Sequence, residues 1–291
     1  MLSADLVNKY SRFIFIGKEK KFVSPEDVCM AATLSQSEVL RDLRLLQDVT
    51  TIVFPSVEQC QRQSRVISTI TGTTTVTVTT TVAHGYQTGE EYVIQGVLGI
   101  TGVNGRKTIT VTTPTAFTLN GTTGSGTYTS GGTVYPLINS LVDLVGGRQM
   151  SPNNFPMTKV DYDQVNNDRE DFGDTSPAET VFRMYQLETD PITIGVQGTP
   201  DSTIKVEARF YRVPLPNEDV SDVVNPIVPD KYKRLMELGT LCYIYEDMDD
   251  MEAIDLATKQ RVLFEKEKMR VQGSVAKARI RSNSQPRSLR W

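Results

Sequence analysis

The stretch Thr75–Gly124 reads TVTVTTTVAHGYQTGEEYVIQGVLGITGVNGRKTITVTTPTAFTLNGTTG, and it lies inside a block, residues 67–133, that holds 22 threonines and 12 glycines. Threonine is β-branched and fits extended strands, while glycine supplies the positive φ angles that tight turns need. The block therefore predicts an all-β barrel or sandwich that has been inserted into another domain.

Short strands and turns alternate through this block. Thr75 to Thr79 alternates threonine and valine with a period of two, which is typical of a strand with one buried face. A turn is expected at 83–89, and further strands are expected at 92–94, 108–112 and 116–119. The only charged side chains of the block are Glu90, Glu91, Arg106 and Lys107. The module therefore has almost no groups for acid–base chemistry.

Helices are expected at both ends of the chain. Ser24 precedes Pro25, and Asp27 follows three residues after the serine, which is a capping box with proline at the first helical position. A second box, Ser35 to Glu38, predicts the start of another short helix. Two adjacent helices also allow a DNA-binding helix-turn-helix, although the second helix offers few side chains for a reading face: Arg41, Arg44 and Gln47.

The second half of the chain combines strands with a pair of helices. Extended segments predict a three-stranded antiparallel meander, whose last strand alternates apolar and charged residues: 181–185, 192–194 and 204–211. Apolar residues at helical spacing from Leu235, and again from Met251, predict two helices that form a hairpin. The acidic residues 247–250 are expected to form the turn between them.

Together these patterns predict an α+β chain. A helical N-terminal region and a C-terminal helical hairpin would flank an antiparallel β meander, with an inserted all-β barrel or sandwich module and an extended C-terminal arm. The expected parts are the N-terminal helical region with a first strand at 1–66, the inserted module at 67–133, the meander at 134–225, the hairpin at 226–272 and the basic arm at 273–291.

No motif for catalysis or ligand binding stands out. His84 is the single histidine, and its glycine-bordered turn favours a packing role over that of a base. Three scattered cysteines lack metal-ligand spacing and are expected to be reduced thiols: Cys29, Cys60 and Cys242. The chain has no nucleotide-binding loop, dinucleotide fingerprint or zinc motif. We therefore expect no enzyme, no catalytic residue, no cofactor and no metal site.

Composition adds expectations about the surroundings of the protein. The formal net charge of −4 is small and nominates no partner. No apolar run approaches the roughly 18 residues that a membrane helix needs. The start of the sequence lacks the basic-then-apolar pattern of a signal peptide. We therefore expect no membrane span and no export signal.

The last part of the chain is basic. Seven basic residues and no acid lie between Lys268 and Trp291. A segment with so few apolar residues is expected to be disordered alone and to fold onto a partner. Nucleic acid, a membrane surface or an acidic protein groove could each attract it, and the prominence of arginine and tryptophan in protein interfaces favours a protein. Its expected contact residues are Lys277, Arg279, Arg281, Arg287, Leu289, Arg290 and Trp291.

The order of these parts resembles the head-to-tail adaptor, or connector, proteins of tailed bacteriophages. The residues that carry the resemblance are the strand Ile204–Tyr211 with the following Arg212-Val213-Pro214, and the helix Pro229–Gly239. Separately, Val76–Leu119 looks like a small β module that is common in phage tail and connector proteins. The same pattern resembles one half-domain of ubiquitin-activating enzymes.

The resemblance implies a structural protein of the virion. Such an adaptor forms a ring, usually of twelve copies, that docks under the portal protein at the capsid vertex and receives a tail or nozzle protein on its other side. Residues 276–291 would be the portal-binding arm, the hairpin at 230–270 would line the ring, and the β module would project outward or toward the tail. DNA would pass through the lumen without sequence-specific binding, and no membrane would be involved. The protein would be found in the neck of the virion, and in the host cytoplasm during assembly.

Two other hypotheses stay open. Another structural part of a phage, such as a tail, baseplate or fibre-attachment protein, could use the β module as its adhesive element. A carbohydrate-binding module or hydrolase would need aromatics along a groove, and for hydrolysis paired carboxylates. The chain contains one tryptophan.

Overall fold

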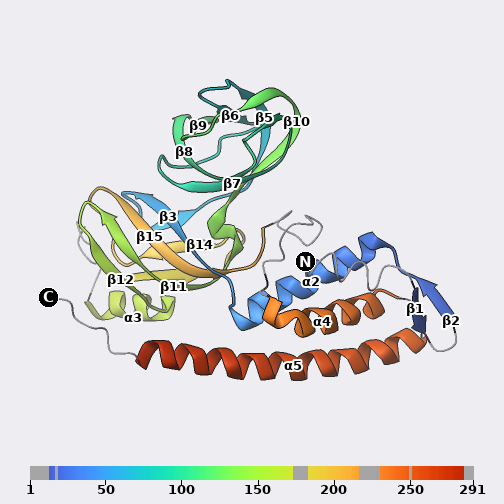
Figure 1. The fold of residues 1–291 in the computed structure, drawn as a ribbon. Helices are drawn as coiled ribbons and strands as arrows, with labels where there is room; N and C mark the ends of the chain where they lie inside the picture. The colour runs from blue at the N-terminus through green and yellow to red at the C-terminus, as the bar shows by residue number, and fades with distance from the viewer. Residues whose placement is uncertain are drawn as a thin grey trace. The chain divides into compact units, whose positions relative to one another are not determined.

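A computed structural model of the protein describes residues 13–16, 19–172, 183–215, 228, 230–248 and 251–284. The chain divides into two compact units, a helical unit made of residues 1–46 and 216–291 and a β unit made of residues 47–215. Of the described residues, 42% are in strands and 32% in α-helices. The predicted α+β class with helical flanks is therefore wrong: the described chain is mostly β, with two barrel-like sheets (Figure 1).

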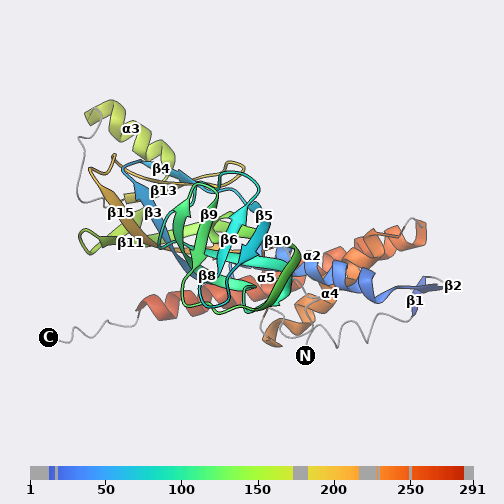
Figure 2. The same cartoon turned by 90° about the horizontal axis from the view of Figure 1, so that it is seen from above.

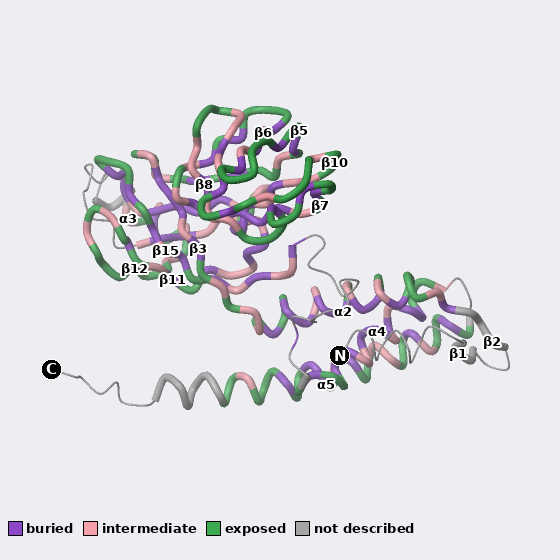
Figure 3. Tube along the Cα trace, turned by 45° about the horizontal axis from the view of Figure 1, so that its top comes forward, coloured by how far each residue is buried: buried purple, intermediate pink, exposed green. Residues whose placement is uncertain are grey.

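The helical unit is built on three helices, α2 (Pro25–Leu43), α4 (Lys233–Glu246) and α5 (Met251–Ser284), with a short 3₁₀ turn, η2 (Asp230–Tyr232), before α4. A small hairpin of β1 (Phe13–Ile16) and β2 (Glu19–Phe22) precedes α2. The predicted capping box is confirmed: the Asp27 N–H donates to Ser24 Oγ at 3.1 Å, and the Ser24 N–H donates to Asp27 Oδ2. Buried residues of α5 recur at spacings of four and seven, which places them on one face of the helix: Ala253, Ala257, Phe264 and Val271 (Figure 3).

Two helix boundaries differ from the prediction. The second capping box does not start a new helix, because Ser35 lies inside α2, buried against the backbone of Gly239. The extended arm expected from Gly273 begins as helix, since α5 continues through Ser284. Alanine, lysine and arginine after Gly273 are strong helix formers, and Val275 still packs against the core, so together they offset the roughly 1 kcal/mol that glycine costs in a helix.

The inserted module is a closed antiparallel barrel in the order β10-β5-β6-β9-β8-β7 (Figure 2). Its strands are β5 (Arg65–Thr71), β6 (Thr77–Thr80), β7 (Glu91–Thr101), β8 (Gly105–Thr113), β9 (Ala116–Leu119) and β10 (Ser125–Pro136). The chain enters and leaves the barrel at one place, because β5 pairs with β10 with Val66 opposite Thr133. Gly99 and Gly126 both have positive φ, and a Cβ on either would lie within about 2.3 Å of a facing carbonyl oxygen. Only glycine allows this close approach of β7 and β10.

A second sheet of seven strands runs in the order β3-β15-β11-β12-β13-β14-β4. Its strands are β3 (Gln47–Pro55), β4 (Gln59–Gln61), β11 (Leu141–Ser151), β12 (Phe155–Lys159), β13 (Arg183–Leu187), β14 (Thr193–Val196) and β15 (Thr203–Arg212). A 3₁₀ turn, η1 (Leu137–Ser140), joins the barrel to β11, and α3 (Tyr162–Phe172) follows β12. The core of this sheet includes Phe54, Met184, Ile194 and Phe210, all fully buried.

The predicted three-stranded meander is wrong in one pairing. β13 and β14 form the expected hairpin, but β15 pairs with β3 and β11 instead of with β14. The sheet must also curl: its two edge strands, β3 and β4, are joined by only three residues, which span about 14 Å at most, while a flat seven-stranded sheet would separate them by roughly 29 Å. β15 lies between β3 and β11, next to one edge strand, and its alternating apolar residues are buried.

Candidate interaction surfaces

A buried ion pair joins the barrel to the seven-stranded sheet. Arg62 follows β4, and its Nε and Nη2 donate to the two carboxylate oxygens of Glu90 at 3.0 and 2.9 Å. Glu90 precedes β7 and also accepts from the backbone N–H groups of Val53 and Gln87 and from the Tyr92 hydroxyl. Arg62 donates further to the carbonyls of Val53 and Gln61. The pair is thus enclosed and fully hydrogen-bonded, which is the condition under which a buried ion pair is tolerated.

A second set of charges covers the outer edge of β3. Arg106 donates to Asp48 Oδ1 at 2.8 Å, to Glu91 Oε2 at 2.6 Å, and to the carbonyl of Val49. Edge strands carry unpaired backbone groups that must be covered or bonded. Three of the four charged side chains of the barrel module, Glu90, Glu91 and Arg106, therefore serve the contact with the sheet.

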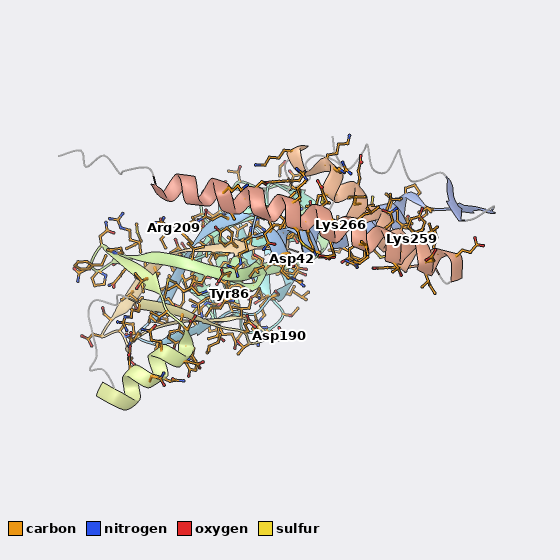
Figure 4. The ribbon with its side chains drawn as sticks, turned by 90° about the horizontal axis from the view of Figure 1, so that it is seen from below. Asp42, Tyr86, Asp190, Arg209, Lys259 and Lys266 are labelled. Carbon is orange, nitrogen blue, oxygen red and sulfur yellow. The ribbon has the colours of Figure 1, made fainter. Side chains whose placement is uncertain are left out.

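His84 has a packing role at the side of the barrel. Its Nδ1 accepts from the Tyr86 N–H at 2.9 Å, so the proton lies on Nε2, which is 3.1 Å from the carbonyl of Thr113. The ring stacks on Tyr86 and meets Phe117 edge-on. Burial lowers the pKa of His84 below its ordinary value of 6.5, although backbone hydrogen bonds oppose this shift. Tyr86, labelled in Figure 4, donates its hydroxyl to the Gln63 carbonyl and belongs to the barrel core.

The described residues contain no group of three or more His, Cys, Asp or Glu side chains that could hold a metal ion. The three cysteines are unlinked, and burial raises the pKa of both Cys60 and Cys242 to about 12. A thiol with so high a pKa is a poor nucleophile at neutral pH. Within the described chain, none of the helices carries an apolar run long enough to cross a membrane.

Charged side chains of all three helices meet in the helical unit. Glu38 of α2 accepts from Arg261 Nη1 at 2.9 Å, from Lys268 Nζ at 2.6 Å and from the Tyr243 hydroxyl. Lys268 also reaches Asp42, which Figure 4 labels beside α5, and Arg261 binds Glu246 through two nitrogens. This network lies at the surface of the three-helix core and fixes which faces of the helices meet.

A groove of about 340 Å³ lies between the first half of α2 and the end of α4, and we call it the α2–α4 groove. Its apolar lining includes two well-exposed side chains, Met30 at 52% and Leu34 at 47% exposure. Three exposed acids also line it: Asp27, Glu246 and Asp247. Exposed apolar groups rimmed by charge are typical of a surface that another chain covers.

The predicted arm residues are distributed over two parts of the chain. Lys277 is exposed on α5, and Arg279 and Arg281 fall within the bounds of the same helix. The remaining four lie outside the described residues: Arg287, Leu289, Arg290 and Trp291. Of the seven predicted contact residues, the described chain therefore places only the first three, all on α5.

Sequence reasoning missed the Arg62–Glu90 pair and the α2–α4 groove. One signal for the pair was present, because a nearly uncharged module that contains adjacent acids needs partners for them. Nothing in the sequence points from Glu90 to Arg62, which lies 28 residues earlier. The groove arises from the packing of α2 on α4, which periodicity alone does not give.

Comparison with known proteins adds one finding. The family described as the ubiquitin-activating enzyme E1 FCCH domain matches residues 71–136, which form most of the barrel. A search of curated proteins gives no match to the chain. The barrel is therefore similar to an FCCH domain, and this likeness concerns less than a quarter of the 291 residues.

Proposed function

We propose that this protein is a structural head-to-tail adaptor of a tailed bacteriophage, which forms a ring between the portal protein and the tail. The observation that carries the proposal is the basic end of α5. The last residue of α5 within the hydrophobic cores of the described chain is Val275, and the helix continues for nine more residues to Ser284. A helix end that carries Lys277, Arg279 and Arg281 without an acid is suited to a contact with an acidic surface of another protein.

The proposal rests also on the resemblance of the strand 204–211 and the helix 229–239 to phage adaptors. The FCCH likeness of the barrel is compatible with it, since folds are shared between unrelated functions. Three of the four charged side chains of the barrel module, Glu90, Glu91 and Arg106, bond the sheet. A second candidate, a tail or fibre-attachment protein, is favoured by the barrel, whose surface is rich in threonine.

A binding experiment with the portal protein of the same virus tests the proposal. The doubly reversed variant Lys277→Glu/Arg281→Glu should lose at least tenfold in portal affinity, because charges at a contact guide and stabilise association. The matched control is Lys259→Glu/Lys266→Glu, which changes the same charge on exposed residues of the same helix (Figure 4). This control should bind as the parent does.

Native mass measurement supplies the second readout. A ring that forms on the portal supports the adaptor, whereas a trimer that ignores the portal points to a fibre-attachment protein. Equal portal binding by the two charge-reversed variants would contradict the role assigned to the end of α5.

A further inference from the structure

We propose that the α2–α4 groove binds residues 285–291 from a second copy of this chain. The groove offers exposed Met30 and Leu34 together with three acids. The segment 285–291 reads QPRSLRW, in which two arginines alternate with leucine and tryptophan. Apolar side chains would cover the apolar lining, and the arginines would face the carboxylates.

The acids of the groove are not equivalent. Asp27 already accepts from the Ser24 backbone, and Glu246 is bound by two nitrogens of Arg261. Asp247 is exposed at the end of α4, one residue past the helix. We therefore assign Asp247 as the main carboxylate for an incoming arginine.

The chain's own segment cannot reach this groove. Val28 and Ala31 of α2 pack with Ala253 and Ala257, so the groove lies near the start of α5. The 27 residues from Ala257 to Ser284 extend about 40 Å along the helix. Seven further residues span at most about 25 Å. Residues 285–291 can therefore fill the groove only of another copy.

A contact of this kind uses two different surfaces of the chain. Head-to-tail contacts close into a ring when the rotation between copies permits, and otherwise give a filament. The inference thus supplies a means of self-association that the proposed function needs but does not specify. In this scheme residues 285–291 contact another copy, and portal binding is left to the helical residues Lys277, Arg279 and Arg281. Self-association and portal binding can therefore be tested separately.

The single tryptophan of the chain, Trp291, gives a direct probe of the contact. Fluorescence of the full-length protein should shift to shorter wavelength, and become protected from acrylamide, as the concentration rises and copies associate. Sedimentation of the same samples should show the growth in mass. Trp291 that stays exposed at every concentration, with or without association, would overturn the proposal.

Charge exchange tests the assigned partner. Asp247→Lys should lower the association constant at least tenfold and leave Trp291 exposed, while Asp201→Lys, the same change on an exposed bend of the β unit, should have no effect. Adding Arg290→Glu or Arg287→Glu to Asp247→Lys should restore association. A second variant, Leu289→Ala, keeps every charge and should weaken association, with circular dichroism and the unfolding midpoint checking that the fold is unchanged. Unchanged association in both Asp247→Lys and Leu289→Ala would refute the contact.

Discussion

Two clusters of ion pairs hold the molecule together: the Arg62–Glu90 pair that joins the barrel to the seven-stranded sheet, here called the joint, and the helical network around Glu38, here called the network. Both consist of carboxylates bound by arginine or lysine, but they differ in their access to water. In the joint, the side chains of Arg62 and Glu90 are 9% and 4% exposed. In the network, Glu38 is 19% exposed, and Arg261 is 32% exposed. Each cluster connects segments far apart in the sequence, so the chemistry and the architectural role are alike while the surroundings are not.

This difference predicts unequal costs of disruption. A charge that is left alone in a buried site loses its partner and has no water to replace it, whereas an exposed charge is quickly solvated. The joint should therefore fail sharply when one partner is removed. The network should weaken gradually, because Lys268 and Arg261 each keep another carboxylate, Asp42 and Glu246.

The largest effect is expected at Glu90. Glu90→Gln should destabilise the β unit by about 3–5 kcal/mol, because Arg62 would remain buried without a counter-charge. Urea unfolding measures this loss. The matched control is Glu91→Gln, a neighbour whose side chain is 28% exposed, and it should cost about 1 kcal/mol or less. Equal losses in the two variants would show that burial does not set the strength of the joint.

A double substitution sharpens the same comparison. Arg62→Met combined with Glu90→Leu removes both charges, so it should recover most of the stability that Glu90→Gln alone loses. Failure to recover would mean that the hydrogen bonds to the backbone of Val53 matter more than the charge pair.

The next effect concerns the packing of the three helices. Gly239→Ala should cost about 1–3 kcal/mol, because a Cβ would lie 2.1 Å from Ser35 Oγ and 2.9 Å from the ring of Phe264. Gly273→Ala in α5 meets nothing within 4 Å, so it should stabilise the helix by roughly 0.5–1 kcal/mol. Thermal unfolding should shift in opposite directions for the two variants. A shift in the same direction would contradict the packing described here.

A smaller effect is expected at Glu38, and it depends on pH. Burial raises the pKa of Glu38, but the hydrogen bonds from Lys268, Tyr243 and Arg261 outweigh it and leave the pKa below its ordinary value of 4.5. The stabilisation is therefore complete above pH 4.5 and is lost as the pH falls toward the lower folded pKa. Glu38→Gln should cost about 1 kcal/mol near neutral pH. The free energy of unfolding of the Glu38→Gln variant should then fall less steeply in acid than that of the unsubstituted protein. If the free energies of the two proteins fall in parallel as the pH is lowered, Glu38 does not contribute through its charge.

The smallest effect is expected at His84. Because the folded pKa lies below 6.5, the unfolded chain binds a proton first as the pH falls, and the β unit loses stability below pH 6.5. His84→Gln should remove this dependence between neutral pH and about pH 5.5, before the carboxylates begin to titrate. If the stability of the His84→Gln variant keeps the same pH dependence, that dependence comes from another titrating group.

Features that depend on neighbouring residues could be predicted from the sequence, whereas features that depend on distant contacts could not. The threonine–valine alternation from Thr75 and the capping box at Ser24 are local patterns, and both correspond to the structure as β6 and the start of α2. The helices from Leu235 and Met251 also follow from local periodicity. The extended arm was wrongly expected to begin at Gly273 because the segment has few apolar residues, although α5 continues through Ser284 and Val275 still packs.

Distant contacts could not be predicted in the same way. The place of β15 between β3 and β11 depends on pairing with segments that lie far from it in the sequence, for example Ile204 with Phe54, and the alternation of β15 fits any neighbour. Ser35 carries a capping signal that its packing against Gly239 overrides. Of the candidate contact residues, Lys277 and its neighbours followed from charge alone, while the α2–α4 groove required the packed helices.

An electron cryomicroscopy reconstruction of the virion neck tests the central proposal most directly. Our account predicts a ring of this chain beneath the portal, with the end of α5 that carries Lys277, Arg279 and Arg281 against the portal protein. Density for the chain at the tail tip, or its absence from the particle, would contradict the proposal.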